Sequence, residues 1–290
     1  MQAISKLVLG TVQFGLNYGV NNKLGQMSVP DAHKILDLAL NAGVRTLDTA
    51  AAYGTSEQVI GDYIKSKGQN PFNIITKLSF KNGETWESSL ENRFSNLSVG
   101  SVDTLMFHSY KDYFETRGEI QEILVAQKGI KFQKIGVSVY TNEELEAIAL
   151  DTNIDLVQSP FNLLDNHLLR ADALRKCKEH KKQVHTRSSF LQGLFFMTEK
   201  DIPLKLKPLS KEIKAVKTIS EKAGVSIGAL ALNYALSKPY IDGVLIGVDN
   251  VKQLEQNLRW AQTKNLESYF DMIDNLLVEE TMLLNPVNWK

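Results

Sequence analysis

Four titratable residues between positions 48 and 108 stand where apolar, strand-like runs end. Asp48 closes one such run, Tyr53 follows it in a turn of small residues, and Lys77 and His108 close the next two runs. Each residue alone is more simply explained as a turn former, a packing residue or a solvated strand end. Together, on neighbouring strands, they suggest shared chemistry.

That chemistry is delivery of a proton to a carbonyl oxygen. A free phenol has a pKa near ~10, too high for ready proton exchange at neutral pH. An adjacent ammonium stabilises phenolate and lowers that pKa, so we expect Lys77 to activate Tyr53 and Asp48 to keep Lys77 charged and in place. His108 would orient or polarise the substrate oxygen, or act in a relay with Tyr53.

Eight short apolar runs, each followed by a helical pattern, must position these residues. Such runs indicate parallel strands buried on both faces, and eight strand–helix units predict an α/β protein with a (β/α)8 TIM barrel in one domain, residues 1–290. A doubly wound sheet is the alternative, but no strand is followed by a Gly-x-Gly-x-x-Gly turn. The expected strands are 7–12, 45–48, 72–77, 102–108, 134–138, 154–158, 183–187 and 242–247.

Helical patterns fill the intervals between these strands, and no low-complexity linker interrupts them. Residues 191–208 are expected to form a longer loop and could act as a mobile flap. The expected helices are 28–42, 56–66, 84–97, 119–127, 141–146, 166–178, 209–223, 226–236, 251–263 and a C-terminal helix at about 267–283.

Bulk composition excludes several classes of protein. Lysine plus arginine and aspartate plus glutamate number 33 each, so no overall charge attracts nucleic acid or an acidic membrane. Cys177 is the only cysteine, which excludes an internal disulfide and multi-cysteine metal sites. No signal peptide and no apolar run near ~20 residues are present. We therefore expect a cytoplasmic protein, a monomer or small homo-oligomer, with neither nucleic acid nor membrane as a partner.

Other chemistries of this barrel fit the strand ends less well. A metal-dependent hydrolase needs a His-x-His pair or several inward ligands, and the 5 histidines are scattered, so no metal site is expected. A Schiff-base aldolase commonly has its lysine on strand six, which here ends in Gln158.

At these positions the sequence resembles the aldo-keto reductase family. The resemblance rests on Leu-Gly-Thr-Val-Gln-Phe-Gly at 9–15, Asp-Thr-Ala-x-x-Tyr-Gly at 48–54, Thr-Lys at 76–77, Asp-x-x-x-x-His at 103–108, Ile-Gly-Val-Ser at 135–138 and Gln-Leu-Glu-Gln-Asn at 253–257. It implies that Asp48, Tyr53, Lys77 and His108 are the family's catalytic tetrad, with Tyr53 as the general acid in reduction. It also implies that hydride passes from NADP(H) to the carbonyl carbon.

The resemblance further implies a cofactor site across the barrel mouth. Ser138 and Gln158 would bind the nicotinamide carboxamide, while Gly247 and Asn257 would help to hold the adenosine end. The complete implied set is Gly10, Thr11, Ser138, Gln158, Arg187, Ser188, Leu191, Gly193, Gly247, Asp249, Gln253, Gln256 and Asn257.

Three positions depart from the family pattern. Val139 replaces an asparagine beside Ser138, and Arg187 replaces the aromatic residue that stacks on the nicotinamide, so we expect its guanidinium plane to stack there instead. Asp249 lies where residues that read the 2′-phosphate are usual, with Lys252 as a partial counterweight. A carboxylate repels a phosphate but accepts a hydrogen bond from a ribose hydroxyl, so NAD(H) is also plausible.

The substrate side is less constrained by the sequence, which predicts a small-molecule carbonyl compound without naming it. Aromatic residues expected on loops over the mouth are Phe14, Tyr18, Trp86 and Tyr110, with Phe161 and Phe190 as further candidates. Two other functions use the same residues: a non-catalytic nicotinamide-nucleotide-binding regulatory subunit, and a lyase or isomerase that uses bound cofactor transiently.

Overall fold

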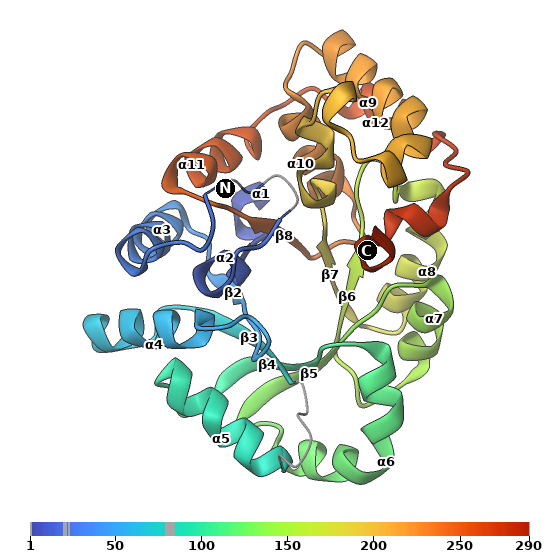
Figure 1. Cartoon of the computed structure of the whole chain (residues 1–290). Coiled ribbons are helices and arrows are strands. Elements are labelled where there is room, and N and C mark those ends of the chain that lie inside the picture. The colour runs from blue at the N-terminus through green and yellow to red at the C-terminus, as the bar shows by residue number, and fades with distance from the viewer. Residues whose placement is uncertain (1, 20–21, 23, 79–84, 290) are drawn as a thin grey trace.

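The protein is a closed barrel of eight parallel strands surrounded by helices, as the computed structural model shows for residues 2–19, 22, 24–78 and 85–289 (Figure 1). Each strand pairs with its neighbour in chain order, and the first pairs with the last. The predicted barrel is therefore confirmed. The strands are β1 (Leu7–Gly10), β2 (Thr46–Asp48), β3 (Asn73–Leu78), β4 (Val102–Phe107), β5 (Phe132–Ser138), β6 (Leu156–Pro160), β7 (Gln183–Arg187) and β8 (Gly243–Gly247).

The helices form the outer layer, and several begin with the caps that their sequences predict. Ser28 accepts a hydrogen bond from the Asp31 backbone, and Thr141 forms a capping box with Glu144. The helices are α1 (Gln2–Ser5), α2 (Val12–Gly15), α3 (Val29–Ala42), α4 (Ser56–Lys67), α5 (Trp86–Leu97), α6 (Tyr110–Gln127), α7 (Asn142–Leu150), α8 (His167–Glu179), α9 (Ser210–Lys222), α10 (Ile227–Ser237), α11 (Val251–Trp260) and α12 (Glu267–Asp274).

Several expected elements differ in extent from those in the structure. The first strand ends at Gly10 because the Thr11 backbone turns toward the Asp48 carbonyl, and Val12 begins α2. The expected helix 119–127 begins instead at Tyr110, where Ser109 caps it by accepting from the Asp112 backbone. Glu84, where the expected helix 84–97 was to begin, lies outside the described residues.

The C-terminal helix is shorter than expected. It ends at Asp274, and the chain continues through η4 (Thr281–Leu284) and η5 (Pro286–Trp289), where Leu284 is buried. The expected loop 191–208 likewise contains short 3-10 segments, η1 (Leu191–Phe196), η2 (Glu199–Asp201) and η3 (Leu204–Leu209). After Asp274 the buried residues Val278 and Leu284 anchor the chain to the core without continuing the helix.

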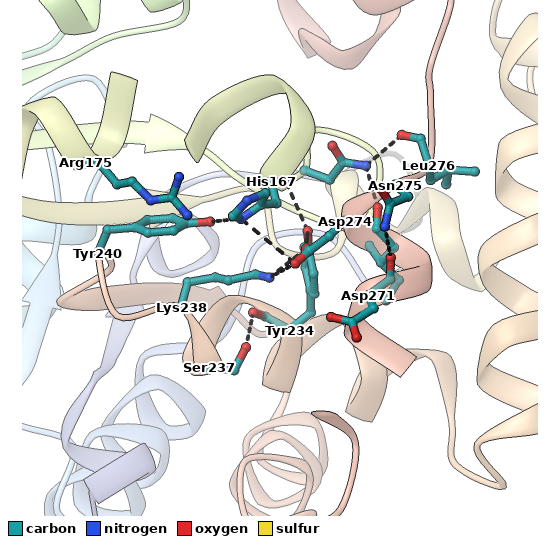
Figure 2. A network of polar contacts seen from close by, with 12 residues as sticks. His167, Arg175, Tyr234, Ser237, Lys238, Tyr240, Asp271, Asp274, Asn275 and Leu276 are labelled. Atoms are coloured by element: carbon teal, nitrogen blue, oxygen red, sulfur yellow. Dashed lines mark hydrogen bonds and ion pairs between the residues drawn. The ribbon is translucent and has the colours of Figure 1, made fainter. Parts of the chain in front are cut away.

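A polar network fastens α12 to α8 and α10 on the outside of the barrel (Figure 2). Asp274 accepts from Lys238 at 2.6 Å and 2.8 Å and from the Tyr234 hydroxyl at 2.5 Å. The same hydroxyl accepts from the His167 backbone at 3.0 Å, and the His167 ring lies 3.0 Å from the Tyr240 hydroxyl. We call His167, Tyr234, Lys238, Tyr240 and Asp274 the outer network.

Strand register gathers the carboxyl ends of the strands at one mouth. Gly10 aligns with Asp48 on one side and with Gly247 on the other, and Ser138 aligns with Gln158. Residues that are far apart in the sequence therefore face one space. Within the described ranges, no helix has the length and apolar character needed to cross a membrane.

Candidate active site

A buried ion pair forms the floor of the barrel mouth. Lys77, at the end of β3, contacts the Asp48 carboxylate at the end of β2, and both residues are 1% exposed. The second Asp48 oxygen accepts from Gln158 Nε2 at 2.8 Å, and Lys77 Nζ also donates to the Thr49 carbonyl at 3.3 Å. These bonds hold the ammonium charged and fix its position.

Tyr53 reaches this pair because of a tight glycine contact. Gly54 has a φ of +57°, and a side chain at Gly54 would place its Cβ 2.3 Å from the Gly15 carbonyl oxygen. A Cβ at Gly15 would in turn lie 1.8 Å from the Tyr53 carbonyl oxygen. This close packing sets the turn that brings the Tyr53 hydroxyl within 3.4 Å of Lys77 Nζ.

His108 completes the cluster from the end of β4. Its ring lies edge-on to Tyr53, with centroids 5.9 Å apart and planes at 84°. Burial lowers the pKa of His108 to about 4, and the Lys77 charge acts in the same direction. His108 is therefore neutral at physiological pH and can donate one hydrogen bond to a substrate oxygen.

Burial and charge oppose each other at Tyr53. Burial raises the pKa of the Tyr53 hydroxyl, and the Lys77 ammonium lowers it by a smaller amount. The expected lowering by Lys77 is thus present but outweighed, because the phenol is enclosed. Burial alone would lower the pKa of Lys77, but Asp48 and Tyr53 together raise it. At neutral pH the arrangement is a protonated phenol beside a charged ammonium.

A cavity of about 630 Å³ opens above the four residues, and it is lined by all four of them. This volume is in the range of small-molecule and cofactor sites. Predicted cofactor and substrate residues that also line it are Gly10, Thr11, Tyr18, Ser138, Gln158, Arg187, Ser188, Gly193, Gly247, Asp249, Gln253, Gln256 and Asn257. Leu191 does not line it, since its side chain is fully buried in the core.

Most of the predicted substrate aromatics lie elsewhere. Phe14 is 1% exposed and belongs to the core, because α2 turns it inward. Trp86 and Tyr110 pack against the core from the starts of α5 and α6, and Phe161 is buried against Tyr234. Tyr18 and Phe190 do line the cavity. Lining residues that were not predicted include Gln13, Tyr140, Gln192, Phe196 and Trp260.

Side chains predicted to bind the two ends of the cofactor already form hydrogen bonds within the protein. Gln158 Nε2 gives one of its two N–H donors to Asp48, so its second N–H and its Oε1 remain for a carboxamide. Asp249 and Gln253 bond to each other: the Asp249 backbone donates to Gln253 Oε1 at 2.7 Å, and Gln253 Nε2 donates to the Asp249 carboxylate at 3.2 Å. The carboxylate of Asp249 thus keeps acceptor capacity at the cavity wall.

The cavity fits a nicotinamide dinucleotide in two respects. Gln13 lines it and has a buried Oε1 with no hydrogen-bond partner among the described residues, which leaves an acceptor for a ligand. Gly247 leaves space beside it, since a Cβ there would lie 2.9 Å from Gln13 Nε2. Within the described ranges, no three His, Cys, Asp or Glu side chains are grouped to hold a metal ion.

The sequence matches the aldo/keto reductase family over residues 6–277, so the chain belongs to this family of oxidoreductases. It is similar to the aldo-keto reductase YhdN of Bacillus subtilis, with 28% identity covering 84% of this chain and 82% of the relative. It is also similar to the L-galactose dehydrogenase of Arabidopsis thaliana, with 26% identity covering 97% of this chain and 92% of the relative.

A solved structure supports the same fold. The holo form of an aldo-keto reductase from Bacillus halodurans superposes with a TM-score of 0.72 over 95% of this chain and 94% of that chain. The sequence identity is 18%, so this likeness concerns the fold alone.

Proposed function

We propose that this protein reduces an aldehyde or ketone to an alcohol with a nicotinamide dinucleotide, and that Tyr53 is the general acid. The observation that carries this proposal is the placement of a protonated Tyr53 hydroxyl, 3.4 Å from Lys77 Nζ, at the floor of the cavity. Only one proton donor of this kind lies beside a buried ammonium among the described cavity residues.

The chain's own residues supply every part of the reaction except the hydride. A reduced dinucleotide held in the cavity would supply hydride to the carbonyl carbon. Tyr53 gives its proton to the carbonyl oxygen, so the substrate gains one hydride and one proton and leaves as the alcohol. The Lys77 ammonium stabilises the phenolate that remains until solvent protonates it again, while His108 donates a hydrogen bond to the oxygen.

A non-catalytic regulatory subunit on the same barrel is the principal alternative. A subunit that only bound nucleotide would have no need for a charged lysine beside a buried phenol. All four tetrad residues are present and line one cavity, which favours catalysis.

The test follows the reduced-nicotinamide absorbance by stopped flow, with dinucleotide deuterated at the transferable position. We expect net oxidation that depends on added carbonyl compound, and one deuterium in the alcohol. Binding without net oxidation would support the regulatory alternative. A transient signal without net oxidation would support a lyase or isomerase.

We further propose that NAD(H) is used comparably to NADP(H) or better. The support is Asp249, whose carboxylate lies at the cavity wall after β8 and would repel a 2′-phosphate. Asp249→Ser and Asp249→Arg should shift the ratio of kcat/KM values toward NADPH. Glu255→Ser is the matched control, since Glu255 is exposed on α11 and outside the cavity. A wild type that prefers NADPH by ~100-fold, about 2.7 kcal/mol, would contradict the role given to Asp249.

A further inference from the structure

Arg187 is a cation of the cavity that no carboxylate of the described residues neutralises. The cavity is lined by the charged residues Asp48, Lys77, Arg187 and Asp249. Asp48 and Lys77 neutralise each other, and Asp249 is bonded to Gln253. Among the described residues, no acidic side chain forms an ion pair with Arg187. A partly buried charge without a counterion lowers stability, which indicates that its partner is a ligand.

The Arg187 guanidinium packs one face against an aromatic ring and donates one hydrogen bond to a backbone carbonyl. It lies 4.1 Å from the Tyr140 ring centroid, and Nη2 donates to the Val139 carbonyl at 3.2 Å. A guanidinium has five N–H donors, so several remain without a partner in the described part of the protein. A planar fork fixed in this way matches the two oxygens of a carboxylate.

The charge of Arg187 acts on the reacting end of the cavity. It is among the charges that lower the pKa values of Tyr18, Tyr53 and His108. Arg187 ends β7, and its guanidinium lies against Tyr140, which follows the end of β5. The cation therefore acts on the tetrad side of the cavity, where a carbonyl substrate would bind.

We propose that Arg187 binds an anionic group of the substrate, so that the preferred substrates are aldehydes or ketones that carry a carboxylate. This inference rests on the proposed carbonyl reduction. It replaces stacking of Arg187 on the nicotinamide, because oxidised nicotinamide is itself cationic and a cation facing it is unfavourable. The carboxylate supplies the counterion that the described residues lack.

The test compares 4-carboxybenzaldehyde with its methyl ester, which share the aldehyde and the ring and differ in charge. We expect wild type to favour the acid in kcat/KM by about 10- to 100-fold, the size of a charge-assisted hydrogen bond. Arg187→Met should bring the ratio near one, and Arg187→Lys should keep part of it. Arg259→Met is the control, since Arg259 is exposed on α11 and outside the cavity, and the ratio should remain as in wild type.

Two results would overturn the inference: a ratio near one in wild type, or an unchanged ratio in Arg187→Met. An unchanged ratio together with weaker dinucleotide binding would place Arg187 against the cofactor. Failure of the proposed function is a different result, namely that neither aldehyde oxidises the dinucleotide. In that case, binding of the two compounds is compared through quenching of the intrinsic tryptophan fluorescence, to which the cavity residue Trp260 contributes. Tighter acid binding that Arg187→Met abolishes supports the inference, and equal binding overturns it.

Discussion

Two clusters of the same four residue types occupy different regions of this protein. Asp48, Tyr53, Lys77 and His108 meet at the barrel mouth, whereas Asp274, Tyr234, Lys238 and His167 meet in the outer network of Figure 2. Each cluster pairs a lysine with an aspartate and places a tyrosine beside the pair. Only the first cluster lines the cavity.

The state of the tyrosine hydroxyl separates the two clusters. Tyr234 donates its proton to Asp274 at 2.5 Å and accepts from the His167 backbone, so both functions of the hydroxyl are used within the fold. Burial and the bond to Asp274 raise its pKa. Tyr53 instead is 3.4 Å from a cation and keeps its proton for a ligand. The same residue types thus serve stability in one place and proton transfer in the other.

Replacing the lysine of each cluster is expected to produce the largest difference in turnover between the two clusters. Lys77→Met and Lys238→Met each leave a carboxylate without its cation, which should cost about 3 kcal/mol of unfolding free energy. Only Lys77→Met should also lower turnover, by ~10²-fold, because the phenolate loses its stabilising charge. Denaturant unfolding and initial rates measure the two effects. A folded Lys238→Met protein with equally reduced turnover would break the comparison.

Removing the Tyr234 hydroxyl tests whether the outer network contributes to stability and not to catalysis. Tyr234→Phe should lower the unfolding free energy by about 1–3 kcal/mol, because Asp274 loses a donor and the His167 N–H loses its acceptor. Turnover should stay at the wild-type level. Tyr269→Phe is the matched control, since its hydroxyl bonds to the Lys222 carbonyl in an exposed position. Equal unfolding free energies for Tyr234→Phe and wild type would show that the Tyr234 hydroxyl adds no stability.

A smaller effect is the pH dependence of stability that comes from His185, a buried histidine on β7. His185 is 3% exposed, its Nδ1 has no hydrogen-bond partner among the described residues, and burial lowers its pKa to about 4. The folded state therefore binds fewer protons than the unfolded state, whose histidine titrates near ~6.5. Stability from this group is present above pH ~6.5 and is lost as the pH falls toward 4, by about 2 kcal/mol between pH 7 and pH 5.

His185→Gln should flatten that loss of stability, whatever its effect at pH 7, because the replacement does not titrate. The measurement is denaturant unfolding of wild type and variant from pH 7 to pH 4.5. His108, which is partly buried and also has a pKa of about 4, remains in both proteins and cancels in the difference. The same slope in both proteins would contradict the account of His185.

Much of this architecture could be predicted because short-range patterns determine it. The apolar runs specify the strands, and the residues that close them specify what meets at the mouth, since parallel strands share a carboxyl edge. Helix starts were readable where a cap was recognised, as at Ser28, and α6 was missed at its start although Ser109 and Asp112 are a capping pair. Tyr140 could also have been found, since it follows strand-end Ser138 closely.

Features that depend on side-chain direction could not be predicted. Nothing local distinguishes Phe14, which α2 turns into the core, from Tyr18, which lines the cavity. The outer network joins α8, α10 and α12 across the chain, and the sequence carries no spacing that relates His167 to Asp274. Its residue types were visible, but their long-range packing was not.

The measurement that tests the central claim most directly is a single turnover in Tyr53→Phe. Enzyme saturated with reduced dinucleotide is mixed with a carbonyl substrate, and loss of the reduced-nicotinamide absorbance is followed by stopped flow. If Tyr53 is the general acid, the variant should bind dinucleotide as wild type does and turn over at least ~10²-fold more slowly. Equal single-turnover rates in Tyr53→Phe and wild type would show that the proton comes from another group, and the assignment of the tetrad would be wrong.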